Sequence, residues 1–189
     1  LVPSALPLGL DGTTRWLSAL AESAGRESVA QAFIDDERAW ASARLDRVVC
    51  DKLAGRRVGL FATPDYLPGL SDMFEADFGM EVAFAIPRTR TQPPADSTAA
   101  ARSLKASDYD PSRQSVNDRI RTELEGRGLD LIVGSGWERN VLDVSFEHLP
   151  FLELGYPSFY RHLLLPSPTL GYRGVLGWAE RFVNALSAP

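Results

Sequence analysis

The six residues GSGWER, at positions 134–139, lie where a predicted strand gives way to a helix. Two glycines let the backbone approach a ligand closely, and a helix N-terminus favours an anion. The third glycine of a dinucleotide fingerprint is absent, a Walker-type loop is missing, and Glu138 would oppose a phosphate. The segment therefore indicates either a ligand-facing turn or simply a tight strand-to-helix turn. Its candidate site residues are Gly134, Ser135, Gly136, Glu138 and Arg139.

The two histidines offer little support for catalysis or metal binding. His148 precedes Leu149 and Pro150 at a predicted helix end, where we interpret it as structural. His162 follows Arg161 in a loop beyond the last predicted strand, and no acidic residue or second histidine lies at metal-ligand spacing from it. A Ser-His-Asp arrangement stays open, but the sequence contains no Gly-x-Ser-x-Gly elbow. We therefore predict no catalytic residue and no metal ligand in this chain.

Other candidates stand at the ends of predicted strands, where parallel sheets bind their ligands. They are Thr63, Asp65, Arg88, Gly155 and Tyr156, together with Arg161 and His162. Asp65 also suits a helix N-cap. Arg88 lies beside Arg90 and Arg102 in or near a polar segment, and such arginines more often form a solvated face than an anion site.

Composition narrows the function classes. The chain has 189 residues and a hydrophobic content of 44%, which is ordinary for a globular protein. Its formal net charge of −5 disfavours binding to nucleic-acid phosphates. No apolar run approaches the roughly 20 residues that cross a bilayer, so no membrane partner is expected. The single cysteine, Cys50, excludes a disulfide framework and suggests a buried thiol in a reduced, cytoplasmic setting. Leu1 is not an initiator methionine and begins no signal peptide, so we expect a fragment or a processed form.

Residues 1–55 are predicted to form a helical segment. Asp11 would cap a helix that starts at Gly12 or Thr13 and ends at Gly25. A longer helix follows up to residue 55. Its predicted apolar stripe consists of Val29, Phe33, Trp40, Leu45 and Val48.

Residues 56–189 alternate between short apolar runs and amphipathic segments. Strands are expected at 57–62, 81–86, 130–136 and 150–156, with helices at 66–79, 116–128, 137–149 and 171–186. Residues 87–115 read as a polar insertion, with a short helix possible near 98–104. This alternation predicts an open parallel sheet with helices on both faces, a Rossmann-like α/β domain, preceded by the helical segment.

Four blocks in this order resemble the nitrogenase component 1 family, which includes the nitrogenases and the dark-operative protochlorophyllide reductases. They are PLGLDGTTRWLSALAESAG near the N-terminus, KLAGRRVGLFATPDYLPGLSDMFEADFGMEVAFA, DLIVGSGWERNV, and the closing stretch PFLELGYPSFYRHLLLPSPTLGYRGVLGWAERFVNAL. The closing stretch is most similar to the C-terminal portion of a β-type subunit. Gly155 occupies the place where a cofactor-binding histidine of the α-type subunit is expected, and Tyr160 replaces the family's usual Asp before Arg161.

The resemblance implies a C-terminal domain of one subunit of a larger reductase. The implied partners are a homologous α-type subunit and an ATP-dependent iron–sulfur reductase protein. An iron–sulfur cluster or metal cofactor would belong to the full complex, and none is expected on this chain alone. Arg161 would fix a loop or a subunit contact. The aromatic side chains Trp137, Tyr156, Phe159 and Tyr160 suit an interface, with a core role as the alternative.

Two further hypotheses stay open beside this one. A cofactor-assembly scaffold of the same family would bind a cluster precursor without reducing a substrate. A stand-alone small-molecule binding domain would use the cleft at GSGWER. The sequence does not choose among dinitrogen, a tetrapyrrole and a carbon–sulfur compound as the substrate of the full enzyme.

Overall fold

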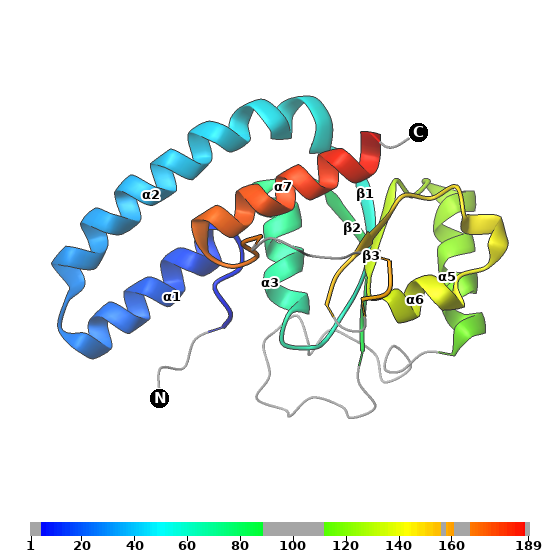
Figure 1. Ribbon diagram of the computed structural model, residues 1–189, viewed down its shortest axis with the longest axis horizontal. Coiled ribbons are helices and arrows are strands. Elements are labelled where there is room, and N and C mark those ends of the chain that lie inside the picture. The colour runs from blue at the N-terminus through cyan, green and yellow to red at the C-terminus, as the bar shows by residue number, and fades with distance from the viewer. Residues whose placement is uncertain (1–4, 89–111, 156–157, 161–166, 188–189) are drawn as a thin grey trace.

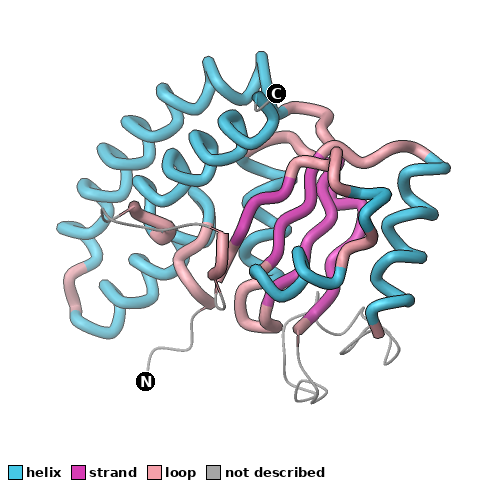
Figure 2. Tube along the Cα trace, turned by 45° about the vertical axis from the view of Figure 1, so that its right-hand side comes forward, coloured by secondary structure: helices cyan, strands magenta, loops and turns pink. Residues whose placement is uncertain are grey.

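Four parallel strands form one sheet in the order β2-β1-β3-β4 (Figure 1). The computed structural model describes residues 5–88, 112–155, 158–160 and 167–187. Tube and ribbon views show the strands running side by side with helices on both faces (Figure 2). The predicted fold class, an open parallel α/β sheet preceded by helices, is confirmed. The strands are β1 Arg57–Ala62, β2 Glu81–Pro87, β3 Leu131–Gly134 and β4 Phe151–Glu153.

Side-chain alternation along β1 divides the interior into two cores. Val58, Leu60 and Ala62 point to one face, where α1, α2, α3 and α7 pack, while Phe61 points to the other, where α5 lies. Each face is apolar because both are covered, which is why the strand reads as a continuous hydrophobic run. The helices are α1 Gly9–Ala24, α2 Glu27–Val48, α3 Leu67–Asp72, α5 Arg113–Gly126, α6 Gly136–Val141 and α7 Gly171–Ser187.

Gly59 shows why one position of β1 carries no side chain. The register between β1 and β2 shifts between Val58 and Gly59, and a Cβ at Gly59 would lie 2.3 Å from the ring of Phe84. The ring of Phe84 therefore occupies this space and packs edge-on against Phe61, with ring centroids 5.4 Å apart.

The two N-terminal helices share a core with the sheet. Leu8, Ile34 and Leu45 belong to the same buried cluster as Leu60 and Trp178. Figure 1 shows α1, α2 and α7 side by side as a helical layer next to the sheet. The predicted division of the chain into a helical segment, 1–55, and an α/β domain, 56–189, stays a prediction.

The first helix begins earlier than predicted. It starts at Gly9 after the N-cap residue Leu8, so the expected capping by Asp11 is wrong. The first turn is instead held by Asp77, whose carboxylate accepts the backbone N–H of Leu10 at 2.8 Å. Gly9 has φ +74°, and a Cβ there would lie 2.8 Å from the Asp77 oxygen. Asp11 pairs with Arg38 of α2.

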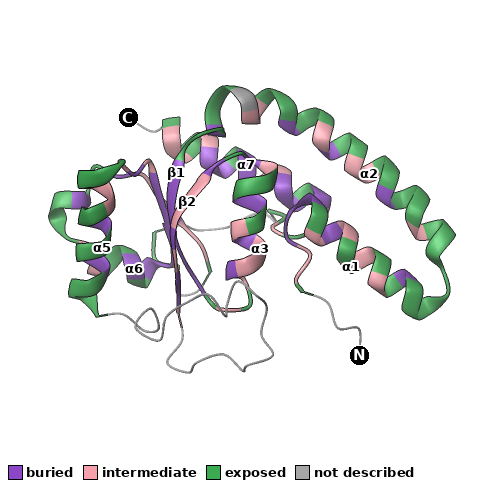
Figure 3. Ribbon diagram, turned by 180° about the vertical axis from the view of Figure 1, so that it is seen from behind, coloured by how far each residue is buried: buried purple, intermediate pink, exposed green. Residues whose placement is uncertain are grey.

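The predicted apolar stripe of α2 is largely wrong. Val29, Phe33 and Trp40 are exposed, whereas Leu45 of the predicted stripe is buried together with Ile34 and Ala41. Figure 3 shows that most of α2 is exposed. The exposed and the buried residues both have helical spacing, but α1 and α7 cover only the buried ones. The guanidinium groups of Arg44 and Arg173 both lie over the exposed ring of Trp40, 4.1 and 5.4 Å from its centroid.

Other elements are shorter than the sequence suggested. The predicted helix at 66–79 is α3 followed by the π-helical turn η2, Met73–Asp77. The predicted helix at 137–149 is the six-residue α6 followed by the 3-10 turn η4, Val144–Phe146, which leaves His148 exposed in a turn. A π-helical turn, η1 Val49–Leu53, extends α2. The predicted helix near 98–104, with Arg90 and Arg102, lies outside the described residues.

Two glycines of α7 let the chain that precedes the helix lie directly on it. A Cβ at Gly174 would lie 2.5 Å from the carbonyl carbon of Thr169, and one at Gly177 would lie 2.6 Å from the carbonyl oxygen of Pro168. The indole N–H of Trp178 donates to the Thr169 carbonyl at 3.1 Å. These contacts fix residues 168 and 169 at the end of the sheet where the strands terminate.

Candidate functional site

A cavity of about 530 Å³ lies at the carboxyl ends of the strands, between the ends of β1 and β3 where the strand order reverses. Its apolar walls are Phe61, Ala62, Leu154 and Trp178. Its polar lining consists of Thr63, Tyr66, Arg88, Ser135, Glu138 and Thr169, with Gly155 at the end of β4. Among the predicted site residues, the fold therefore brings together Thr63, Arg88, Ser135, Glu138 and Gly155.

Ser135 and Glu138 form a capping box at the start of α6. The backbone N–H and the hydroxyl of Ser135 both donate to Glu138 Oε2, at 2.8 and 2.5 Å, and the N–H of Trp137 donates to Ser135 Oγ at 3.2 Å. The sequence dictates this motif, because a serine followed three residues later by a glutamate satisfies the free N–H groups of a helix start. Glu138, only 1% exposed, is thus the anion that this turn holds.

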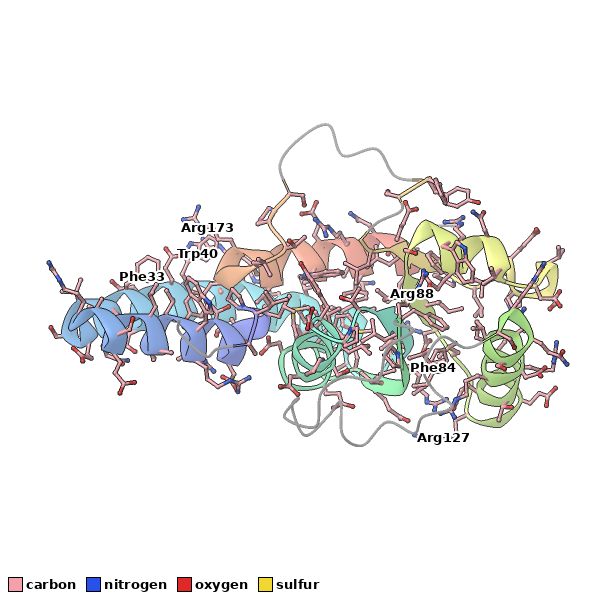
Figure 4. The ribbon with its side chains drawn as sticks, turned by 90° about the horizontal axis from the view of Figure 1, so that it is seen from below. Phe33, Trp40, Phe84, Arg88, Arg127 and Arg173 are labelled. Carbon is pink, nitrogen blue, oxygen red and sulfur yellow. The ribbon has the colours of Figure 1, made fainter. Side chains whose placement is uncertain are left out.

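Arg88 supplies the opposite charge from the residue after β2. Its Nη1 contacts Glu138 Oε1 and donates to Ser135 Oγ at 3.1 Å. The guanidinium lies over the ring of Trp137, 4.7 Å from the ring centroid, and Arg88 is labelled in Figure 4. A buried carboxylate needs such a partner, since an unpaired charge in the interior is very costly. The expectation that Arg88 lies on a solvated face is therefore wrong.

The first glycine of GSGWER, Gly134, makes room for Glu138. A Cβ at Gly134 would lie 3.2 Å from the Glu138 Cβ and 3.3 Å from the ring of Phe151. Gly136 is the buried first residue of α6. The space beside the backbone of Gly134 is therefore filled by the side chain of Glu138 from the same turn.

Two predicted residues lie at or beyond the rim of the cavity. Thr63 is exposed, and its carbonyl accepts the N–H groups of Tyr66 and Leu67 at 3.0 and 3.1 Å, which begins α3. Asp65 is exposed and does not line the cavity. Its predicted N-cap role is wrong, because the N-cap residue of α3 is Tyr66.

Arg139 does not line the cavity, and its side chain lies against two aromatic rings. Its guanidinium lies 4.6 Å from the ring centroid of Tyr160 and 5.6 Å from that of Phe151. The hydroxyl of Tyr160 donates to the side-chain oxygen of Asn140. The backbone N–H of Phe159 donates to Glu153 at 2.7 Å, which fixes this loop to β4.

Three exposed aromatic residues follow the ends of the neighbouring strands β3 and β4, and we call them the aromatic patch: Trp137, Phe159 and Tyr160. Their exposed fractions are 44%, 54% and 52%. A core role is therefore wrong for these three residues. Tyr156, Arg161 and His162, the remaining predicted site residues, lie outside the described residues.

Sequence reasoning missed several lining residues. Tyr66 follows the strand-end segment TPD and could have been found from its position. Thr169 is held at the cavity by the approach of the chain before α7 to Gly174 and Gly177, and Trp178 lines it from α7 itself. No sequence motif predicts either position.

The strand order and the cleft at the switch point define a Rossmann-like α/β domain of the doubly wound class. The family model described as "Nitrogenase component 1 type Oxidoreductase" matches residues 2–187. The chain belongs to this family, and the resemblance seen in the sequence is confirmed.

The similar curated proteins are nitrogenase β chains. The molybdenum-iron protein β chain of Clostridium pasteurianum is 24% identical, with 95% of this chain and 38% of that protein covered. The β chain of Klebsiella pneumoniae is 28% identical, with 96% and 36% covered. The iron-iron protein β chain of Rhodobacter capsulatus is 28% identical, with 96% and 39% covered.

A solved structure titled "Nitrogenase Cp1 at pH 6.5" has the same fold. The two superpose with a TM-score of 0.71 at 22% sequence identity, over 95% of this chain and 38% of the other. The chain thus spans well under half the length of the proteins that it matches.

The names of the relatives refer to metal centres, so the donor set of the cavity can be compared with that chemistry. Both oxygens of Glu138 are occupied by Ser135 and Arg88, and the described lining residues include no cysteine or histidine. Across the described residues, no three His, Cys, Asp or Glu side chains gather as a metal site would require. The residues of this cavity do not fit a metal cluster. None of the described helices has the length and apolarity of a membrane span.

Proposed function

We propose that this chain is the C-terminal domain of a β-type subunit of a cytoplasmic nitrogenase-like oxidoreductase. Other domains and a separate protein would supply the iron–sulfur centres and the ATP-dependent delivery of electrons. The family match over residues 2–187 supports the proposal, as do the β-chain relatives, of which this chain covers less than two fifths. In this role the domain needs a packed sheet and a surface for a homologous α-type subunit.

The observation that carries the partner-facing role is the aromatic patch. Trp137 and Tyr160 each have a guanidinium group stacked on the ring, from Arg88 and Arg139 respectively. Aromatic and arginine side chains are enriched at the centres of protein interfaces. Glu153 holds the loop at Phe159 and Tyr160 in place, so docking there would cost little ordering of the backbone.

The test is co-purification of the full-length gene product with its α-type partner. Replacing both Trp137 and Tyr160 by alanine is expected to weaken the complex at least about tenfold, as removal of an interface hot spot does. Val144→Ala is the matched control, because Val144 is 73% exposed and lies outside the aromatic patch. Equal capture of the partner by both variants would remove the support for this surface.

A second experiment separates the reductase from the assembly scaffold. The isolated chain of 189 residues is expected to show no reductase activity and to bind no stoichiometric iron. The purified full-length complex would then be assayed for metal content and for reduction of acetylene or a tetrapyrrole. A cluster-loaded complex that reduces neither would favour the scaffold, whereas a coloured, iron-loaded isolated chain would contradict the proposal.

A further inference from the structure

We propose that the cavity at the strand ends binds a small neutral molecule of one or two flat rings, recognised by Arg88 through an uncharged acceptor atom. This inference concerns the cavity and does not depend on the proposed role in a reductase. Its three components are the size and walls of the cavity, the donors of Arg88 and the charge of the site.

The walls of the cavity suit a flat, largely apolar molecule. At about 530 Å³, the cavity falls within the range of roughly 300–1,000 Å³ typical of small-molecule sites. Three aromatic side chains contribute to its lining, namely Phe61, Tyr66 and Trp178. Such rings bury ligand area at a low entropic cost and pack favourably against other rings.

Arg88 offers donors that are already positioned. Its Nη1 is engaged by Glu138 and Ser135, and its plane is held over Trp137. Among the described residues, no acceptor engages its Nε or Nη2. Because the guanidinium is fixed before a ligand arrives, a hydrogen bond to these donors loses little side-chain freedom.

The charge balance of the site favours a neutral acceptor over an acid. Arg88 already neutralises the carboxylate of Glu138, which is almost fully buried. A ligand carboxylate would bring a second negative charge close to Glu138 with only one positive charge between them. A carbonyl oxygen or a ring nitrogen would instead accept a charge-assisted hydrogen bond and leave the pair balanced.

Three probes of nearly equal shape test the ligand class on the 189-residue chain. They are acetylnaphthalene, ethylnaphthalene and naphthoate, each substituted at the same ring carbon. Dissociation constants come from NMR titration of the backbone amides. The indole N–H signal of Trp178, which lines the cavity, reports whether the probe binds at this site. We expect acetylnaphthalene to bind at least about tenfold more tightly than both others, the value of one hydrogen bond to a charged donor.

Two variants connect the preference to this cavity. In the double variant Arg88→Met, Glu138→Met, the net charge of the site stays zero and both side chains lack a hydrogen-bond donor, so acetylnaphthalene and ethylnaphthalene should bind equally. Thr63→Trp fills the rim from an exposed position and leaves the ion pair intact, so all binding should be lost. Arg15→Met is the control, since Arg15 is an exposed arginine outside this cavity.

Three results would overturn the inference. The first is absence of binding by all probes to the unmodified chain. The second is equal affinity for acetylnaphthalene and ethylnaphthalene, and the third is tightest binding of naphthoate. None of these results bears on the proposed subunit role, which is tested separately through the aromatic patch and partner capture.

Discussion

The carboxylate of Asp77 accepts the backbone N–H of Leu10 and thereby ties the first turn of α1 to the segment after α3. Burial raises the pKa of Asp77 to about 6, although the hydrogen bond from Leu10 and the charge of Arg38 act in the opposite direction. The negative charges of Asp11 and Asp72 raise the pKa further. The tie is therefore made by a group that titrates near neutral pH.

Asp77→Asn should remove a pH dependence of stability. The folded carboxyl group holds its proton more tightly than the unfolded one, so the free energy of unfolding falls as pH rises from near 3.8 to about 6 and is level above that. Urea unfolding of both proteins across this range gives the measurement, because other carboxyl groups cancel in the difference. The free energy of unfolding of the variant, relative to that of the parent protein, should increase as pH rises. A difference that does not vary with pH would contradict the prediction.

Arg88→Met should destabilise the fold because it leaves the carboxylate of Glu138 buried without its counter-charge. We expect a loss of about 1–3 kcal/mol, reduced from the usual cost of breaking a buried pair because Arg88 is one-third exposed. Adding Glu138→Gln should recover most of this loss, since the amide oxygen can still accept from Ser135. Arg139→Met is the control, with an expected loss under about 1 kcal/mol. If Arg88→Met costs no more than the control, the ion pair does not stabilise the fold.

Gly174→Ala should be strongly destabilising although it lies within a helix. Alanine is ordinarily the better helix residue by roughly 1 kcal/mol. Here its Cβ would lie 2.5 Å from the Thr169 carbonyl carbon, and backbone atoms cannot move aside as a flexible side chain can. We expect a net loss of about 1–3 kcal/mol by thermal or urea unfolding. Gly126→Ala in α5, where nothing lies within 4 Å of the added atom, should be neutral or stabilising.

Arg57→Lys should cost about 1–3 kcal/mol despite keeping the charge. Arg57 is 8% exposed at the start of β1, and its guanidinium contacts Glu123, Glu81 and the carbonyl of Gly128. Burial opposes its charge, but the two glutamates outweigh that effect and raise its pKa. An ammonium group cannot serve all three partners in one plane. Arg127→Lys, at an exposed arginine paired with Glu81, should change the free energy of unfolding little in the same assay.

The alternation of strands and helices could be predicted because both faces of the sheet are covered. An apolar run such as 58–62 is typical of strands that are buried on both faces. The buried face of α2 could not be predicted from spacing alone. Phe33 and Trp40 lie seven residues apart on one side of the helix, and Ile34 and Ala41 have the same spacing. Which set is buried depends on how α1 and α7 pack, and this follows from distant residues.

The candidate site was predictable up to the strand ends. Thr63, Arg88, Ser135 and Gly155 follow from the rule that parallel sheets bind ligands at that edge. The position of Thr169 depends on the contact of its segment with two glycines of α7, and this contact leaves no local signature in the sequence. The pairing of Arg88 with Glu138 joins two residues that are far apart in the sequence, and only the sheet brings them together.

The balanced pair of Arg88 and Glu138 also determines how the cavity should respond to salt. A site without net charge exerts no long-range attraction on a passing solute, so dissolved ions have little to screen. The rate and strength of binding should therefore be nearly the same in dilute buffer and in concentrated salt. A phosphate-binding cleft at the same edge of the sheet would lose affinity steadily as the ionic strength rises.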